Sequence, residues 1–518
     1  MSRGLYTTTV AIMVITLVSR ILGFLRETAI AAYFGASEVS DAFFIAFSIP
    51  GVLFAAMASA IGTTFIPVYQ RLGKEDRTYF MHNITSVLIV MSLAVTVISI
   101  FFAPYLVKIF APGFETETFH LSVQLTRILL WMVVLLTLNA LFTAYLQSHQ
   151  YFLMPAAVGI PFNIVVVLYL FMFGASLGIV GFTWITLVAT IAQVLFLVPS
   201  LLRAGYRYRF VIDLKEQGLR QATVLVGPVM IGTIASQLNI IVDRMLASGL
   251  TEGSISALNY SNKVMQLAYG IVVISLLSVL YPRLSKIAAN NDWNQFRLTL
   301  SRTTIVLLLV LLPITVGSMV LAKPIISVLF ERGVFDAQAT ELTAGAYFFF
   351  SIGLIGLGTR ELWTKAFYSL QDTKTPMTNG IFAIGLNIVL NLILVGPMQH
   401  LGLALATSIS FIVASFLQYR SLTRQIGTLW TKTMTVSLLK MIAASTVMGG
   451  VVYALSVYVP WHEGTFVWRA FLLTAIIVLG ALTYVVMLFA FREDVTLDVM
   501  RRGWVKLKGL ALSRLGAR

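Results

Sequence analysis

Charged side chains interrupt an otherwise apolar stretch near the start of the chain. Residues 19–47 contain Arg20, Arg26, Glu27 and Asp41 within or beside long hydrophobic runs. An arginine at the centre of a membrane helix costs about 2.5–3.5 kcal/mol even on the most permissive insertion scale, so such residues normally face a polar cavity or a partner. Guanidinium groups bind phosphate oxygens through two parallel hydrogen bonds. These residues therefore predict a polar pathway that suits an anionic ligand.

The two arginines need a particular helix geometry to act together. Arg20 and Arg26 lie about 600° apart around an ideal helix, so they share a face only if the helix bends, which Gly23 allows. Lys263 is the most suitable cation from the second half of the chain. The alternative is that these cations only neutralise buried acids.

Further charges fall inside the predicted spans, where basic residues outnumber acidic ones. Lys365 and Lys440 lie near span ends, where long side chains reach towards the interface. Without these two, the interior keeps a net positive charge. Asp243–Arg244 and Arg360–Glu361 are neighbours in sequence and so point in different directions on a helix; we expect each to pair with another helix. Arg127 completes the set.

The composition is that of an integral membrane protein. Of the 518 residues, 58% are hydrophobic and only 11% are charged, whereas soluble domains have about 25% charged residues. The apolar stretches are continuous, which predicts membrane helices rather than the alternating pattern of a β-barrel. No cysteine is present, which excludes disulfides and thiol chemistry. The first stretch lacks a cleavage site and is predicted to be retained.

The chain is predicted to be an all-α membrane protein with about fourteen spans. Most of the 36 lysine and arginine residues lie on segments that would be cytoplasmic if the N-terminus is cytoplasmic. This places both termini in the cytoplasm and explains the net charge of +15 without nucleic acid. The spans are expected at about 6–34, 39–70, 80–110, 118–148, 154–174, 178–203, 219–248, 254–288, 294–330, 337–370, 375–396, 399–424, 434–458 and 466–491.

The sequence repeats its landmarks at an offset of about 215–221 residues. The segment TTFIPVYQRL around Pro67 corresponds to SVLYPRLSKI around Pro282, and Pro104 corresponds to Pro324. Each repeat contains six spans, so the two lobes have the same orientation in the membrane. The predicted organisation is an N-terminal lobe at 1–215, a C-terminal lobe at 216–428, an additional helix pair at 429–492 and a basic cytoplasmic tail at 493–518.

A second set of polar residues could bind a small cation. Asn387 and Asn391 lie one helical turn apart, and with Asp243 and Thr407 they could supply hard oxygen ligands. The alternative is ordinary hydrogen bonding between helices. The chain has no GxxxxGK[ST] loop and no HExxH motif, so the sequence predicts neither bound ATP nor a zinc site.

Several segments resemble the MurJ family of lipid II flippases within the MOP exporter superfamily. They are SRILGFLRETAIAAYFGASEVSDAFFIAF, TTFIPVY, LTEGSISALNYSNKVMQLAYG, SIGLIGL and FYSLQDTKTP. The resemblance implies two lobes around a cationic cavity for the diphosphate head of lipid II, with the last two helices forming a groove for the polyprenyl tail. It implies substrate binding by Ser19, Arg20, Arg26, Asp41 and Lys263. Further cavity candidates are Glu27, Arg127, Arg360 and Glu361, and a sodium ion is the candidate for Asp243, Asn387, Asn391 and Thr407.

The expected function is transport of lipid-linked peptidoglycan precursor from the inner to the outer leaflet of the bacterial cytoplasmic membrane. We expect no covalent catalysis, and a sodium ion is the only candidate cofactor. The expected partners are lipid II and membrane lipids, and cell-wall synthesis proteins are further candidates. Two alternatives stay open: a flippase for another polyprenyl-linked oligosaccharide, and a drug–cation antiporter of the same superfamily. The net positive interior favours an anionic substrate over a drug cation.

Overall fold

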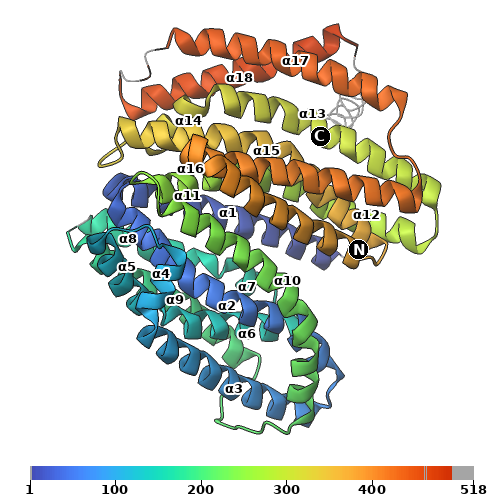
Figure 1. Ribbon diagram of the computed structural model, residues 1–518. Coiled ribbons are helices and arrows are strands. Elements are labelled where there is room, and N and C mark those ends of the chain that lie inside the picture. Colours follow the sequence, from blue (N-terminus) through green and yellow to red (C-terminus); the bar gives the residue numbers. More distant parts are fainter. Residues whose placement is uncertain (1–2, 175, 460, 462–463, 493–518) are drawn as a thin grey trace, which may run out of the picture. The chain divides into compact units, whose positions relative to one another are not determined.

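The computed structural model describes residues 3–174, 176–459, 461 and 464–492, and every regular element in this part of the chain is a helix (Figure 1). The predicted all-α fold class is thereby confirmed. The elements are α1 (Arg3–Phe34), α2 (Glu38–Arg71), α3 (Lys74–Phe101), α4 (Ala103–Phe110), α5 (Thr116–Leu129), α6 (Met132–Ser148), α7 (Leu153–Ala157), α8 (Gly159–Phe173), α9 (Gly178–Arg203), α10 (Gln217–Ala247), α11 (Ser254–Tyr269), the π-helical turn η1 (Gly270–Ile274), α12 (Ser275–Ala289), α13 (Trp293–Val320), α14 (Ala322–Phe330), α15 (Ala337–Ser369), α16 (Lys374–Ile426), α17 (Lys432–Val457) and α18 (Phe466–Ala490).

Among the described residues, eleven helical segments are long and apolar enough to cross a membrane. One of them, α16, has 53 residues and contains a break at Gln399, whose backbone is non-helical at φ 50° and ψ −134°. This break lies at the first residue of the span predicted at 399–424, close to the end of the span predicted at 375–396. The helices α1 and α10 have 32 and 31 residues and are not among the eleven. The count of fourteen spans therefore stays a prediction.

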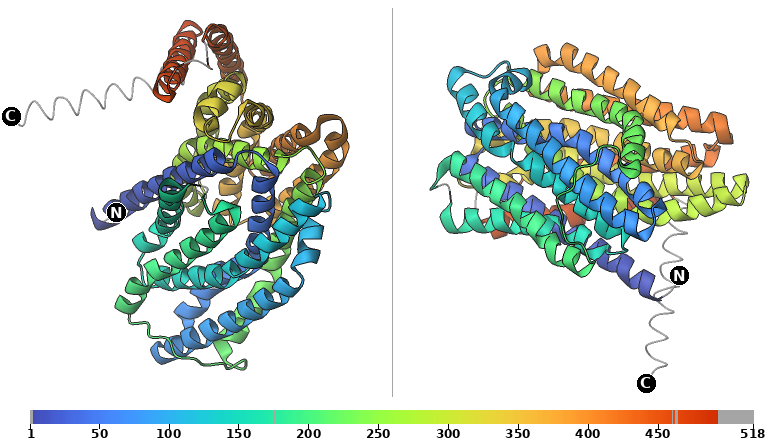
Figure 2. Two further views of the ribbon diagram at one scale, coloured as in Figure 1. Left: turned by 90° about the vertical axis from the view of Figure 1, so that its left-hand side faces the viewer. Right: turned by 90° about the horizontal axis from the view of Figure 1, so that it is seen from below.

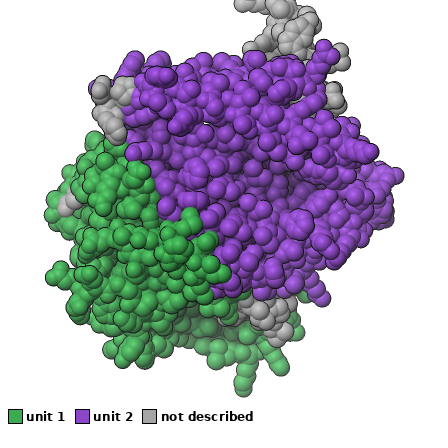
Figure 3. All heavy atoms as spheres, turned by 45° about the horizontal axis from the view of Figure 1, so that its top comes forward, with its two compact units in different colours: residues 1–260, 330–342, 391–400 green, residues 261–329, 343–390, 401–518 purple. Residues whose placement is uncertain are grey.

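The chain divides into two compact units (Figure 3). Unit 1 comprises residues 1–260, 330–342 and 391–400, and unit 2 comprises residues 261–329, 343–390 and 401–518. These units are defined by spatial contacts, whereas the predicted lobes are defined by the sequence repeat, so the lobe boundaries stay a prediction.

Unit 1 is organised around α2. This helix packs against α5, α6 and α10, while α1 packs against α7 and α8. Its apolar core includes Phe65, Phe80 and Leu146, which are fully buried, and the aromatic rings of Phe65 and Phe80 stack at a centroid distance of 5.8 Å. Buried aromatic side chains remove large apolar areas from solvent and so fix α2 against α3 and α6.

Unit 2 contains the last two helices, which lie side by side in Figures 1 and 2. Gly480 allows α18 to approach α17 closely, because a Cβ atom there would lie 2.7 Å from the side chain of Val452. Small residues permit such close packing between membrane helices. The Tyr484 hydroxyl also donates a 3.0 Å hydrogen bond to the Leu309 carbonyl, which ties α18 to α13.

The sequence repeat is visible in the local structure of each unit. The helices α3 and α13 both have 28 residues, and each is followed after one residue by a short helix, α4 or α14. The intervening residues, Phe102 and Leu321, have similar backbone angles of φ −91°, ψ 10° and φ −97°, ψ 19°. Both short helices begin just before Pro104 or Pro324. Proline is favoured in the first turn of a helix, where no intrahelical acceptor is lost.

Candidate functional site

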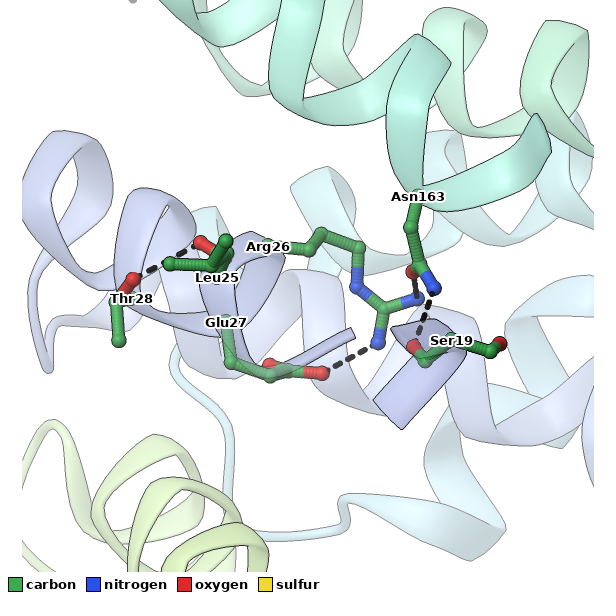
Figure 4. Close-up of polar contacts among 6 residues, drawn as sticks. All are labelled: Ser19, Leu25, Arg26, Glu27, Thr28 and Asn163. Atoms are coloured by element: carbon green, nitrogen blue, oxygen red, sulfur yellow. Dashed lines mark hydrogen bonds and ion pairs between the residues drawn. The ribbon is translucent and has the colours of Figure 1, made fainter. Parts of the chain in front are cut away.

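The guanidinium of Arg26 is held by two neighbours within unit 1 (Figure 4). It forms an ion pair with Glu27 and donates a 3.3 Å hydrogen bond to Asn163 Oδ1. Its Cζ atom also lies 5.1 Å from the centroid of the Phe162 ring. The side chains of Arg26 and Glu27 are only 18% and 5% exposed. Because a buried cation needs such partners, this network makes Arg26 tolerable in an apolar helix.

Asn163 connects the two ends of the motif on α1. Its Nδ2 donates a 3.2 Å hydrogen bond to the Ser19 carbonyl while its Oδ1 accepts from Arg26 (Figure 4). Ser19 and Arg26 are seven residues apart and so share a face of α1. Gly159 permits this approach of α8, because a Cβ atom there would lie 2.6 Å from Ser19 Oγ. Sequence reasoning missed Asn163; the signal was a single amide in an otherwise apolar helix.

Glu27 is nearly fully buried, and only one of its two carboxylate oxygens interacts with Arg26. Its Oε1 pairs with Arg26, whereas its Oε2 has no hydrogen-bond partner among the described residues. The same two side chains border a cavity of about 20 Å³, lined also by Phe43, Phe44 and Phe182. A space of this size accommodates about one water molecule. The head groups of Arg26 and Glu27 therefore lie against a small aromatic cavity within unit 1.

Arg20 differs from Arg26 in having no hydrogen bond or ion pair to another described residue. Its side chain is half-buried on α1. Arg127, on α5, is exposed and also lacks such a partner in the described chain. Of the two arginines in the motif, Arg20 has all its N–H donors available for a ligand.

Asp41 is buried in the first turn of α2 and binds the start of α11. It accepts hydrogen bonds from the backbone N–H of Gly253 at 2.9 Å and from the backbone N–H and hydroxyl of Ser256 at 2.7 and 2.6 Å. The carboxylate thus caps the N-terminus of α11, where the helix dipole favours a negative charge. We call Asp41, Gly253 and Ser256 the clasp. Substrate contact by Asp41 stays a prediction.

The turn between α1 and α2 places Asp41 in this position. Gly35 ends α1 with φ 65°, and Ser37 then caps α2 by a reciprocal arrangement with Ser40. Tyr260 supports the turn by donating a 3.1 Å hydrogen bond to the Gly35 carbonyl. These contacts explain why α2 begins where it does and why its first turn is rigidly connected to α11.

The candidates in unit 2 lie in different environments. Lys263 is half-buried on α11 and has no hydrogen bond or ion pair to another described residue. Arg360 lies 5.2 Å from the centroid of the Phe411 ring. Glu361 pairs with Lys365 on its own helix at 3.4 Å, so the prediction that it would pair with another helix was wrong; the i,i+4 spacing within α15 is sufficient.

Two hydrogen bonds join the candidate sodium ligands, one within each unit. In unit 1, Asn391 donates a 2.6 Å hydrogen bond to Asp243 Oδ1, and Asn239 donates to Asp243 Oδ2 at 3.3 Å. The expectation that Asp243 would pair with another helix is confirmed. In unit 2, Asn387 donates to Thr407 Oγ1 at 3.4 Å. The described residues contain no cluster of three or more His, Cys, Asp or Glu side chains able to hold a metal ion.

Comparison with known proteins places this arrangement in one family. A family model described as "Lipid II flippase MurJ" matches residues 30–472. The chain belongs to the MurJ family. A probable lipid II flippase MurJ of Buchnera aphidicola (strain APS) is 31% identical over 468 residues, which cover 88% of this chain and 92% of that protein. The corresponding protein of Vibrio cholerae is 29% identical, with 94% and 96% covered.

Solved structures agree with this assignment to the MurJ family. A lipid II flippase MurJ in an inward closed conformation superimposes with a TM-score of 0.80 at 26% identity, covering 94% of this chain and 99% of that one. An inward-facing multidrug resistance transporter of the MATE family has a TM-score of 0.66 at 13% identity. The second similarity shows only that the MurJ fold is shared within the MOP superfamily.

Proposed function

We propose that this chain is a lipid II flippase that works by alternating access and carries out no covalent chemistry on its substrate. The observation that supports this most strongly is the family match across residues 30–472. The cations of α1 add a chemical reason, since arginine side chains in an apolar helix suit a diphosphate that must cross the membrane. Lipid II and the surrounding membrane lipids are the partners that this function requires.

In this proposal, Arg20 binds the diphosphate and Arg26 positions α1. The Arg20 guanidinium has no partner among the described residues, so its N–H groups are available to bind phosphate oxygens. Arg26 is already committed to Glu27 and Asn163, so its main role is to hold Ser19 and its own turn of α1 against α8. Lys263 supplies a further cation in this proposal, on the basis of its match to the family motif alone.

The clasp suits a step of alternating access. Three hydrogen bonds to a buried carboxylate hold the first turns of α2 and α11 together. We propose that this contact keeps the predicted periplasmic end of unit 1 shut and that it breaks when the transporter opens outward. Because each hydrogen bond to a charged group contributes about 1.5–3 kcal/mol, substrate binding or an ion gradient has to offset this loss.

Sodium is proposed as a candidate coupling ion at Asp243 and Asn391. A carboxylate and an amide oxygen are ligands of the type that hard cations prefer. The test is thermal stability of the purified protein with sodium or choline chloride. We expect sodium to stabilise the native protein and Asp243→Ala to abolish this effect. No sodium-dependent shift, or an equal shift in the variant, would contradict the site.

The two alternatives differ in substrate class. A drug–cation antiporter needs a net negative charge where its substrate binds. Here, by contrast, Arg20 on α1 and Lys263 on α11 are cations without a counter-ion among the described residues. A flippase for another polyprenyl diphosphate would bind the same phosphates. Growth of a cell depleted of its own lipid II flippase separates these alternatives, because only transport of lipid II restores the cell wall.

The complementation experiment uses the whole chain and three variants. We expect the unaltered chain to restore growth, and Arg20→Ala to abolish it at equal membrane expression. Arg20→Lys should retain part of the activity if charge is the essential property. Lys286→Ala, an exposed cation at the end of α12, is the matched control and should grow normally. Normal growth of Arg20→Ala would overturn the assignment of this residue.

A further inference from the structure

The segment that joins α9 to α10 is an extended strap bound to the side of α3 (Figures 1 and 2). We define the strap as residues 204–216. Its backbone is bonded mainly to α3 side chains rather than to other strap residues. Asn83 forms a reciprocal pair with Asp213, donating to its carbonyl at 2.7 Å and accepting from its N–H at 2.8 Å. Ser86 accepts a 3.1 Å hydrogen bond from the Val211 N–H.

Aromatic hydroxyls complete this attachment. Tyr206 donates a 2.9 Å hydrogen bond to Thr85, and burial raises the pKa of the Tyr206 phenol to about 12 despite that bond. Tyr208 lies 3.1 Å from Ser86 Oγ. The polar residues of α3 that make these contacts, Asn83, Thr85 and Ser86, are all nearly fully buried. They would be costly in an apolar helix without partners, and the strap provides these partners.

Pairing one edge of the strap with α3 turns a row of apolar side chains outward. Phe210, Ile212 and Leu214 alternate along the strap and are 67%, 47% and 71% exposed. Alternation is expected for an extended chain, because successive side chains point to opposite sides. A row of exposed apolar side chains of this kind marks an interaction surface rather than a solvated loop.

Basic side chains surround this row. Arg203, Arg207, Arg209 and Lys215 are exposed, and Arg220 follows in the first turn of α10. The two acids of the same stretch are engaged locally: Asp213 accepts from Tyr79 and the Lys215 N–H, and Glu216 caps α10. The surface that the strap presents is therefore apolar and cationic.

The position of the strap along α3 indicates what covers it. The α3 residues that hold it, 82–86, lie inside a segment able to span the membrane, Glu75–Phe101, and roughly 12–18 Å from the start of α3 at 1.5 Å per residue. The apolar row of the strap therefore lies beside one half of a candidate membrane span, towards the end at which α3 begins. Positive residues at that end match anionic headgroups.

We propose that the strap is an interfacial binding site for anionic phospholipid, distinct from lipid II transport. Phe210, Ile212 and Leu214 insert between headgroups of the inner leaflet, and the surrounding cations bind their phosphates. The strap is therefore a membrane anchor for the connection between α9 and α10. The hydrogen bonds to α3 give the strap the fixed orientation that such an anchor needs.

The absence of cysteine from the chain makes a depth measurement direct. Phe210→Cys and Leu214→Cys are labelled with an environment-sensitive fluorophore in the full-length protein, in nanodiscs of phosphatidylcholine with or without phosphatidylglycerol. We expect doxyl-labelled lipid to quench the fluorophore at both positions and iodide in the solution not to reach it. The fluorophore should lie deeper in nanodiscs that contain phosphatidylglycerol. Asn290→Cys, on the exposed turn after α12, is the control. Its fluorophore should be quenched by iodide and not by doxyl-labelled lipid. Two labelling positions guard against failure of one variant to fold.

A charge series then tests the ligand class. Replacing Arg207, Arg209 and Lys215 by glutamine should weaken binding of phosphatidylglycerol by about fivefold per charge, which corresponds to about 1 kcal/mol for each basic residue near an anionic surface. Arg283→Gln with Lys286→Gln, two exposed cations of α12, should leave the insertion of the Phe210 label unchanged. Iodide access to both strap labels in lipid nanodiscs would overturn the proposal. Protection seen only in native membranes would also overturn it, because a protein would then cover the strap.

Discussion

At the scale of residues, the amide of Asn163 decides how the charged motif of α1 is arranged. It bonds both the Ser19 carbonyl and the Arg26 guanidinium, and so it fixes α1 to α8 over two turns. Arg26 and Glu27 neutralise each other beside this amide. The unpartnered cation of the motif within the described residues is then Arg20, which is why we assign it to the diphosphate.

We predict that Asn163→Leu lowers both stability and transport. The variant loses two hydrogen bonds, one of them to a charged group, so the free energy of unfolding should fall by about 2–4 kcal/mol. Thermal unfolding of the purified protein measures this change. Ile164→Ala, at the exposed neighbouring position, is the control and should retain the contacts of Arg26. An unchanged unfolding midpoint in Asn163→Leu would show that this network does not hold α1.

The sequence predicted the charges of this site better than their partners. Arg20, Arg26 and Glu27 stand out because charge is rare in an apolar helix, and the cost of burying it is a general property of membranes. Asn163 does not stand out, because one amide in a helix is common and its partners depend on the packing of α1 against α8. The pair of Glu361 and Lys365 differs, because its i,i+4 spacing within α15 is visible in the sequence and was overlooked.

At the scale of elements, the clasp depends on the backbone of Gly253. This residue has φ 79°, and a Cβ atom there would lie 2.4 Å from the Ala36 carbonyl oxygen. We predict that Gly253→Ala destabilises the junction of α2 and α11, since a left-handed conformation alone costs about 1–2 kcal/mol for a residue with a side chain. Hydrogen exchange at the Ser256 amide should then become faster.

Gly249→Ala provides the matched control for this prediction. Gly249 lies in the same loop, has no positive φ, and a Cβ atom there would meet only the Leu246 carbonyl oxygen at 4.0 Å. It should leave exchange at Ser256 unchanged. Equal exchange rates in the two variants would mean that the close approach of Gly253 to Ala36 does not secure the clasp.

The turn from α15 to α16 has a pH-dependent cap. Partial burial alone would raise the pKa of Asp372, but hydrogen bonds from the Thr375 side chain and backbone, from Gln425 and from the Lys374 N–H lower it below its usual value. A carboxyl whose pKa is depressed on folding contributes stability above its unfolded pKa, which is near 3.9, and loses it as pH falls through the folded value.

We therefore predict that Asp372→Asn destabilises the protein at neutral pH. The difference in unfolding midpoint from the unaltered chain should shrink below about pH 4, because the unaltered carboxyl then becomes protonated as well. Thermal unfolding across this pH range measures the effect. Glu75→Gln, in the exposed first turn of α3, serves as a control for loss of a surface acid. A constant difference at all pH values would contradict the role of the Asp372 charge.

Continuous apolar stretches made most helices predictable as elements, but they did not predict the strap. Pro104 and Pro324 marked the repeat, but the spans predicted at 80–110 and 294–330 ran through the breaks before α4 and α14 without interruption. Residues 204–216 have no regular secondary structure of their own. Their path depends on buried side chains of α3, Asn83 and Ser86 in particular, which resemble ordinary polar residues within a helix in the sequence.

At the scale of the whole molecule, composition was sufficient for the fold class but not for the division into compact units. Hydropathy determines which segments are apolar enough to lie in lipid, and the family match supports the predicted transport function. The units depend on which helices contact each other, and residues 330–342 and 391–400 join unit 1 although they follow Tyr260 in sequence by 70 residues or more. Local patterns carry no information about such distant contacts.

The most direct test of the central claim is the accessibility of the lipid II head group in cells depleted of their own flippase. Lipid II is labelled metabolically, and an external enzyme that cannot cross the membrane cleaves only the molecules in the outer leaflet. Cells that express this chain should show extensive cleavage, and cells that express Arg20→Ala at the same level should show little. Equal protection of lipid II with and without this chain would contradict the account.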